Sequence, residues 1–141
     1  MKTQALIIAT LILAITTSCN QNQKAKTVQK NADFTDVKWK LTSLLDKPIN
    51  NSDAFISFAT EDNKVFGNAG CNNFIGTYTL KKGMHFELSP LATTKKMCED
   101  MSIEAQFLEV LEKADNYSIN GNTLHLQKDQ TAPLAVFELM E

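Results

Sequence analysis

The sequence contains no arginine, so all fourteen of its basic residues are lysines, set against sixteen acidic residues. Arginine supplies the planar fork of donors that binds a phosphate or a guanine edge in two places at once. The formal net charge of −2 adds no excess of basic surface. The absence of arginine and the acidic balance together argue against nucleic acid as a partner.

Long hydrophobic runs are also missing, with one short exception near the N-terminus. Residues 5–15 are apolar apart from Thr10, and this stretch is about half of the ~20 residues that a membrane-spanning helix needs. A run of this length behind a single lysine is typical of the apolar region of a signal peptide. We therefore assign residues 1–18 to a signal peptide and expect an exported protein.

The residues around Cys19 predict how the chain is processed. Thr16, Thr17 and Ser18 precede it, and small residues directly before a cysteine resemble a bacterial lipobox, which places a diacylglyceryl group on that cysteine. This pattern predicts a lipid anchor on Cys19 and a position in the cell envelope. Thr16 and Ser18 also suit an ordinary signal peptidase, so the alternative is a secreted chain that begins at Cys19.

Residues 19–33 are polar and show no hydrophobic periodicity. A flexible segment of this length reaches about 20 Å on average, which is enough to hold a small domain just off a membrane. We expect this segment to be a tether and residues 34–141 to form a single domain. After removal of residues 1–18, thirteen lysines face sixteen acidic residues, so the mature charge is 13 − 16 = −3.

Short alternating segments with turn residues between them predict that most of the domain is β-structure. In the first segment Val37, Trp39 and Leu41 share one face. In the fourth, Phe74, Tyr78 and Leu80 are in phase and are expected to be buried together. The predicted strands span residues 37–41, 54–59, 64–70, 74–80, 85–91, 116–119, 123–128 and 134–139.

The hydrophobic period changes to that of a helix once, over residues 102–115. Ser102 is the expected N-cap, and Glu104 is expected on the outer face, where the helix dipole favours a negative charge. One helix among consecutive short strands predicts an α+β, mainly β, fold: an antiparallel curled sheet or partly closed barrel of about eight strands with the helix packed on it. The apolar stripe of the predicted helix consists of Phe107, Leu111 and Ala114.

The segment FGNAGCNNFIGTY, residues 66–78, combines glycines and asparagines with a cysteine. A phosphate-binding loop would need one of the known glycine spacings before a helix, whereas this segment runs into a predicted strand. Glycine and asparagine tolerate positive φ, so Gly70, Asn72 and Asn73 are expected to form a sharp connection or bulge between two strands.

Cysteine and histidine are both scarce. If Cys19 is lipidated, Cys71 and Cys98 remain as an even pair in an exported chain, and they form a disulfide, stay as buried thiols, or provide a reactive thiol. His85 and His125 lie inside predicted strands without zinc-ligand spacing. There is no Gly-x-Ser-x-Gly elbow. We therefore expect no metal, no cofactor and no catalytic residues.

A set of motifs spans the domain. It begins with Trp-x-Leu and continues with Gly-x-x-Gly-Cys-Asn-x-Phe-x-Gly-x-Tyr, then a threonine four residues before a second cysteine, then Glu-x-x-Phe-x-x-x-Leu. This set, over residues 37–139, resembles the META/HslJ domain family. At Asn73 the family commonly has a basic residue, so a role that needs this charge is not expected here. The matching residues are Trp39, Leu41, Gly67, Gly70, Cys71, Asn72, Phe74, Gly76, Tyr78, Thr94, Cys98, Glu104, Phe107 and Leu111.

The resemblance implies a compact β-rich domain with one helix, of a kind found in exported and envelope proteins. Similar members are linked to the heat-shock response, to novobiocin resistance and, in some parasites, to motility and virulence. No catalytic residues carry over from the family. Because Cys71 and Cys98 match its motif positions, the resemblance also implies that the two lie close together.

These observations predict a monomeric, non-enzymatic domain, anchored to the membrane through Cys19. It would contribute to stress or antibiotic tolerance by binding an envelope protein, a glycan or a lipid. Two alternatives remain open. One is an inhibitor module that presents the segment from Cys71 to a lytic enzyme or protease, and the other is a thiol redox protein that uses Cys71 and Cys98.

Overall fold

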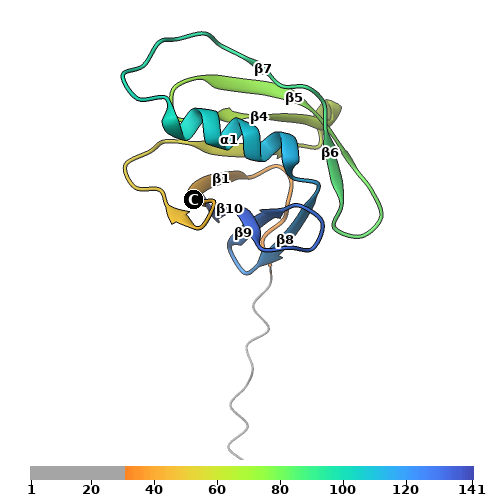
Figure 1. Cartoon of the computed structure of the whole chain (residues 1–141). Helices are drawn as coiled ribbons and strands as arrows, with labels where there is room; N and C mark the ends of the chain where they lie inside the picture. Colours follow the sequence, from red (N-terminus) through yellow and green to blue (C-terminus); the bar gives the residue numbers. More distant parts are fainter. Residues whose placement is uncertain (1–30) are drawn as a thin grey trace, which may run out of the picture.

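The computed structural model describes residues 31–141, so the predicted signal peptide, Cys19 and most of the predicted tether lie outside the described residues. Figure 1 shows a strongly curved sheet with one helix across it. The strands are β1 (Lys38–Leu44), β2 (Lys47–Pro48), β3 (Phe55–Ala59), β4 (Lys64–Asn68), β5 (Asn73–Leu80), β6 (Phe86–Leu88), β7 (Ala92–Thr93), β8 (Asn116–Asn120), β9 (Thr123–Gln127) and β10 (Pro133–Leu139). The helix is α1 (Ser102–Lys113), and a 3-10 turn, η1, spans Glu61–Asn63.

Eight antiparallel strands form one continuous sheet in the order β6-β5-β4-β3-β1-β10-β9-β8. Its two end strands meet, because the Phe86 amide donates to the Asp115 carbonyl at 2.9 Å and the Tyr117 amide donates to the Met84 carbonyl at 2.8 Å. An isolated bridge between His85 and Asn116 lies between these two bonds. The sheet is therefore a nearly closed barrel, and the predicted fold class is confirmed.

All eight predicted strands are present. Two further strands, β2 and β7, were not predicted; they have two residues each and pair with β1 and β5, respectively, outside the main strand order. A strand of two residues has no measurable period, so hydrophobic alternation cannot reveal it. The hairpin predicted at Asn120-Gly121-Asn122 joins β8 to β9, and Gly121 adopts a φ of 59° there.

The barrel interior is filled by aromatic and aliphatic side chains. Phe107 of α1 packs edge-on against Phe74 of β5, with 5.8 Å between ring centroids, and in a tilted arrangement against Phe137 of β10 at 5.7 Å. Phe34 is stacked between Phe58 at 4.2 Å and Tyr117 at 4.0 Å. The helix thus contributes to a core in which strands from both halves of the sheet meet.

Three expectations about individual positions were wrong. Leu80, the last residue of β5, is 47% exposed. Ser102 is the first residue of α1, not its N-cap, which is Met101; the carboxylate of Asp100 accepts the Ser102 amide at 2.8 Å. Glu104 is buried rather than on the outer face.

The N-terminal end of the described chain also belongs to the domain. The Ala32 amide donates to the Gly121 carbonyl at 2.8 Å, and the Gly121 amide donates to the Asn31 side chain at 2.8 Å. Residues 31–33 were predicted to belong to the tether, but these contacts attach Asn31 and Ala32 to the β8–β9 turn. Within residues 31–141, no helix has the length and apolar character to cross a membrane.

Asp115 takes part in closing the barrel through its backbone carbonyl and in surface ion pairing through its side chain. Its carboxylate pairs with Lys128 and accepts the Asp129 amide at 2.6 Å. These bonds, the one from Lys128 above all, hold the pKa of Asp115 below its ordinary value. Because the folded pKa lies below the unfolded one, the stabilisation is complete above the unfolded value of about 3.9 and is lost as the pH falls through the folded pKa.

Asp115→Asn is therefore expected to lower the free energy of unfolding at neutral pH by up to about 1 kcal/mol, the usual range for an exposed ion pair. The difference from the wild type should shrink below about pH 4. Thermal unfolding between about pH 2 and 7 measures both effects. A difference that stays constant down to the lowest pH would contradict this role of Asp115.

Candidate functional site

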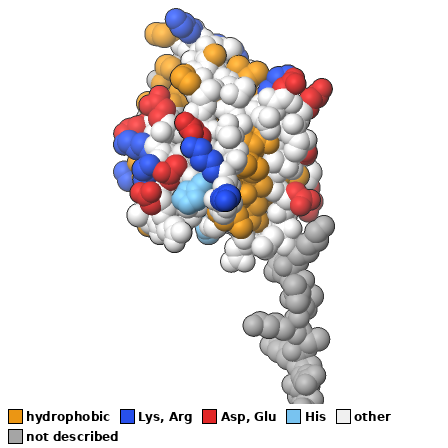
Figure 2. Space-filling model, turned by 90° about the vertical axis from the view of Figure 1, so that its right-hand side faces the viewer, with side chains coloured by type: hydrophobic (Ala, Val, Ile, Leu, Met, Phe, Trp, Pro, Cys, Tyr) orange, Lys and Arg blue, Asp and Glu red, His pale blue; other side chains and the backbone are white. Residues whose placement is uncertain are grey.

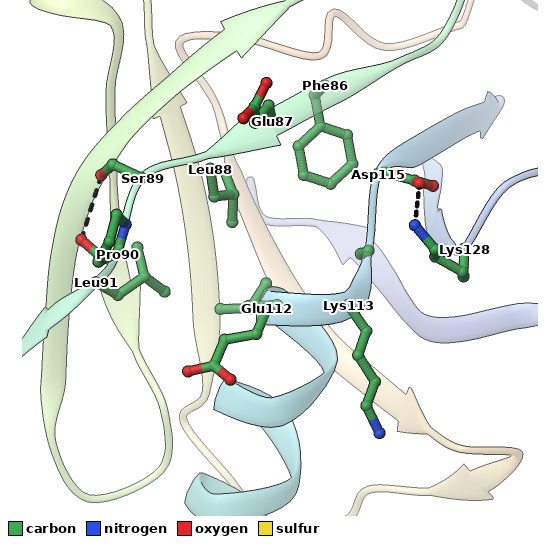
Figure 3. Close-up of a pocket in the computed structure, with 12 residues that line it drawn as sticks. Phe86, Glu87, Leu88, Ser89, Pro90, Leu91, Glu112, Lys113, Asp115 and Lys128 are labelled. Atoms are coloured by element: carbon green, nitrogen blue, oxygen red, sulfur yellow. Dashed lines mark hydrogen bonds and ion pairs between the residues drawn. The ribbon is translucent and has the colours of Figure 1, made fainter.

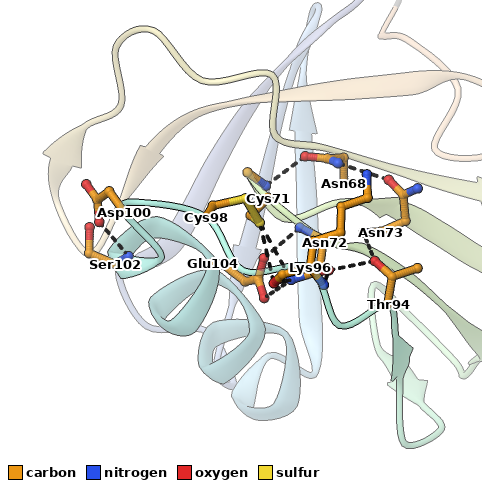
Figure 4. Close-up of a disulfide and its surroundings, with 11 residues drawn as sticks. Asn68, Cys71, Asn72, Asn73, Thr94, Lys96, Cys98, Asp100, Ser102 and Glu104 are labelled. Atoms are coloured by element: carbon orange, nitrogen blue, oxygen red, sulfur yellow. Dashed lines mark hydrogen bonds between the residues drawn. A yellow bond between two sulfur atoms is a disulfide. The ribbon is translucent and has the colours of Figure 1, made fainter.

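Three segments meet beside the N-terminal end of α1: the β4–β5 turn, the loop of residues 94–101 between β7 and α1, and the first turn of the helix itself (Figure 4). The β4–β5 turn carries Cys71 and Asn72, and the helix contributes Glu104. The loop of residues 94–101 is called the β7–α1 loop below. The structure brings together at this point most of the polar motif residues singled out in the sequence.

The backbone of Asn72 is bonded on both sides. Its amide donates to Oε2 of Glu104 at 2.7 Å, and its carbonyl accepts the Ala69 amide at 2.8 Å. Gly70, which lies between Ala69 and Asn72 in the sequence, has a φ of +112°, a conformation that residues with a side chain rarely adopt. A glycine is thus needed to turn the chain so that the Asn72 amide faces the helix.

The side chain of Asn72 uses both of its polar atoms. Oδ1 accepts the Thr94 hydroxyl and the Lys96 amide, each at 2.7 Å. Nδ2 donates to Oε1 of Glu104 at 3.0 Å and to the Lys96 carbonyl at 3.1 Å (Figure 4). Asn72 is only 2% exposed, so this one residue connects the turn, the loop and the helix in the interior.

These bonds explain why Glu104 is buried. Its two carboxylate oxygens accept the backbone and the side-chain N–H groups of Asn72, and a buried carboxylate is tolerated only when it is hydrogen-bonded in this way. The helical period alone puts Glu104 outside the apolar stripe. The sequence could not show that a polar partner from a distant turn faces that position.

A disulfide joins Cys71 to Cys98, with their Cα atoms 6.1 Å apart. This is consistent with the first of the three expectations for the cysteine pair. Cys71, in the β4–β5 turn, is buried, and Cys98, in the β7–α1 loop, is exposed. The loop is therefore held at Lys96 by hydrogen bonds and at Cys98 by a covalent bond.

Close packing explains the two other glycines of the motif, Gly67 and Gly76. A Cβ atom on Gly67 would lie 2.1 Å from the Phe55 carbonyl oxygen, and one on Gly76 would lie 2.7 Å from the Leu91 side chain. The expectation of positive φ was wrong for Asn72 and Asn73, since neither has it. Asn72 is needed for its side-chain amide, whereas Asn73 pairs with Asn68 at 2.9 Å on the surface.

The remaining motif residues do not line the site. They belong to the barrel core, where each is at most 4% exposed: Trp39, Leu41, Phe74, Tyr78, Phe107 and Leu111. Burial raises the pKa of Tyr78, and the nearby Asp36 carboxylate adds to this effect.

The outer side of the β7–α1 loop was not predicted to be a contact surface. Lys95 and Lys96 are exposed, and Met97 is 93% exposed, far above the other exposed large hydrophobic residues of the described chain. The available signal in the sequence was that Met97 directly precedes Cys98, so a disulfide at Cys98 would hold Met97 in place. Because the loop is held from behind by Asn72 and Cys71, this apolar side chain is available for contact with a partner.

Two hollows lie near the helix ends. A cleft of about 400 Å³ opens at the C-terminal end of α1, with Phe86, Leu88 and Leu91 on its floor and Glu112 and Lys128 among its charged residues (Figure 3). A smaller one, of about 250 Å³, lies beside the disulfide and includes Asp53, Asp100 and Ile103. Neither collects a convergent set of groups such as a nucleophile and a base.

The surface has a mixed character. On the face shown in Figure 2, lysine and carboxylate side chains alternate closely, and an elongated hydrophobic strip lies beside them. Among residues 31–141, no group of three or more His, Cys, Asp or Glu side chains is placed to hold a metal ion. His85 bridges to Asn116, and His125 lies in β9.

Asn72→Ala is expected to lower the free energy of unfolding by about 3 kcal/mol or more, because it removes the side-chain bond to the Glu104 carboxylate and the side-chain bonds to Thr94 and Lys96. The backbone amide of residue 72 still donates to Glu104, but the buried carboxylate has one donor fewer. Asn73→Ala is the matched control: this neighbour is exposed, and its loss should cost about 1 kcal/mol or less. Chemical denaturation measures both. Equal losses for the two variants would show that Asn72 has no special role.

Comparisons with known proteins identify a family and structures of similar fold. The META domain family matches residues 32–141. An NMR structure of a protein from Burkholderia xenovorans is 20% identical, with a TM-score of 0.61 over 76% of this chain and 83% of the other. A second NMR structure is 23% identical, with a TM-score of 0.58 over 73% and 88%.

A crystal structure of a DUF4847 family protein from Bacteroides vulgatus is 16% identical, with a TM-score of 0.50 over 75% of this chain and 92% of the other. These likenesses show the fold alone. No curated protein matches the chain. The family match extends over most of the sequence and includes the turn, the loop and the helix that form the site. The chain therefore belongs to the META domain family.

Proposed function

We propose that this protein is a non-enzymatic binding domain, anchored in the cell envelope through Cys19, that contributes to stress or antibiotic tolerance. In this proposal the β7–α1 loop is the contact surface for another envelope component. The observation that supports it is the contrast between the inner and outer sides of the loop. The inner side is bonded to Asn72 and Cys71, whereas the outer side presents Met97 at 93% exposure.

A fixed loop favours binding because little conformational entropy remains to be lost when a partner arrives. The bonds to Asn72 and the disulfide remove that freedom during folding. The polar atoms of Asn72, buried behind the loop, already have partners within the domain. Their arrangement therefore supports a structural role, with recognition left to the exposed residues Lys95, Lys96 and Met97.

The contact is testable with a photo-crosslinking amino acid in place of Met97, in cells that produce the protein. Met84 is the control position, since it is also an exposed methionine, at 54%, but lies on the β5–β6 hairpin. We expect one identified partner to be crosslinked from position 97 and not from position 84. Replacing Cys71 and Cys98 together by Ala should weaken that crosslink, because the loop loses its covalent attachment. Identical crosslinked products from both positions would contradict the proposal.

The anchoring is tested independently by cell fractionation and intact-mass analysis. We expect the wild type in the membrane fraction, with a mass that corresponds to a diacylglyceryl group on Cys19, and Cys19→Ser in the soluble fraction. Cys98→Ser is the control and should stay with the membrane. A soluble wild-type protein that begins at an unmodified Cys19 would support secretion and exclude the lipid anchor.

A further inference from the structure

We propose that the β7–α1 loop binds as a substrate-like inhibitor in the active-site cleft of a serine endopeptidase, with the Met97 side chain in the pocket that selects the residue before the cleaved bond. This inference rests on the proposed function, since it names the class of partner that the loop contacts. It follows from the backbone geometry of the loop, from the exposure of Met97 and from the way both sides of one peptide bond are held.

The loop continues the extended geometry of β7. Ala92 pairs with Ile75, the Thr94 amide donates to the Asn73 carbonyl at 3.0 Å, and the Lys96 amide donates to Oδ1 of Asn72 at 2.7 Å. Inward bonds at every second residue are the pattern of a strand at the edge of a sheet. The side-chain amide of Asn72 takes the place of a neighbouring strand, since it bonds both the N–H and the C=O of Lys96.

The opposite backbone edge of the loop is free for a partner. Within the described residues, the backbone amides of Lys95 and Met97 have no backbone acceptor, and no residue from 92 to 101 has positive φ. An extended segment with free outward N–H and C=O groups is what a cleft recognises when it binds a chain by adding it as a strand. Peptidase substrates are bound in this extended form.

Met97 is suited to a specificity pocket. Its side chain is unbranched and apolar, and at 93% exposure it contacts almost nothing in its own domain. Insertion into an apolar pocket would therefore bury most of its surface without breaking an internal contact. A deep apolar pocket of this kind determines the preference of chymotrypsin-like enzymes, whereas an acidic pocket determines that of trypsin.

The peptide bond between Met97 and Cys98 is held on both sides. Lys96, one residue before Met97, is bonded to Asn72, and Cys98 is covalently joined to Cys71. In the enzyme, the serine oxygen attacks the Met97 carbonyl carbon, the bond to the Cys98 nitrogen breaks, and that nitrogen takes up the serine proton and leaves as an amine. Because Cys98 remains attached, the amine stays beside the acyl carbon and re-forms the peptide bond, which returns the proton to the serine.

The test is inhibition of purified serine endopeptidases by the full-length protein, measured with small chromogenic substrates. We expect chymotrypsin or subtilisin to be inhibited at about 10 µM or below. Met97→Lys should weaken inhibition of chymotrypsin by about tenfold or more and create inhibition of trypsin, because the pocket preference changes from apolar to basic. Met84→Lys is the control and should leave inhibition of chymotrypsin unchanged without creating inhibition of trypsin.

A second variant tests whether the disulfide is needed for inhibition when Met97 is left in place. With Cys71 and Cys98 both replaced by Ala, the amine is no longer held after attack, so the loop should be cut after Met97 as an ordinary substrate. Absence of inhibition by the wild type, or failure of Met97→Lys to transfer inhibition to trypsin, overturns this inference. A crosslinked partner at position 97 that is not a peptidase would also overturn it while leaving the proposed binding function intact.

Discussion

The side-chain amide of Asn72, bonded to the Glu104 carboxylate, is the interaction on which the rest of the site depends. A buried carboxylate is costly unless donors surround it, and a buried amide is costly unless all of its donors and acceptors are used. The Glu104 carboxylate accepts the backbone and side-chain N–H groups of Asn72, and the backbone of Lys96 and the Thr94 hydroxyl occupy the remaining positions of the amide. Removing either partner would leave a buried polar group unsatisfied, which makes the helix, the turn and the loop dependent on one another.

The disulfide reinforces the same arrangement by a different physical route. Cys71 and Cys98 are separated by 27 positions, and closing a loop of this size stabilises a fold by about 3–4 kcal/mol in the chain-entropy treatment. The hydrogen bonds of Asn72 act in the folded state, whereas the disulfide acts largely on the unfolded chain. Together they fix a loop that has almost no hydrophobic contact with the barrel, as the exposure of residues 92–100 shows. This is the physical basis for assigning recognition to the β7–α1 loop.

The barrel itself has a supporting role. Its closure through the amides of Phe86 and Tyr117 leaves the end strands paired, so the sheet has few open edges. The exposed edge that remains beside the site is the short strand β7 and its continuation toward Lys96. The open edge and the fixed loop are therefore the same segment, which connects the architecture of the domain with the proposed mode of binding.

The sequence by itself determined the helix and every strand longer than two residues, and its resemblance to the META/HslJ family implied the proximity of the two cysteines. Trp39 and Leu41 are two positions apart, and this spacing alone places both side chains on the same face of a strand. Only the tertiary structure decided that Glu104 faces inward and that Asn72 replaces a strand for Lys96, because these contacts join residues 24 and 32 positions apart. It likewise decided that Leu80 is left uncovered and Met97 is presented to solvent, since exposure depends on which distant elements pack over a residue.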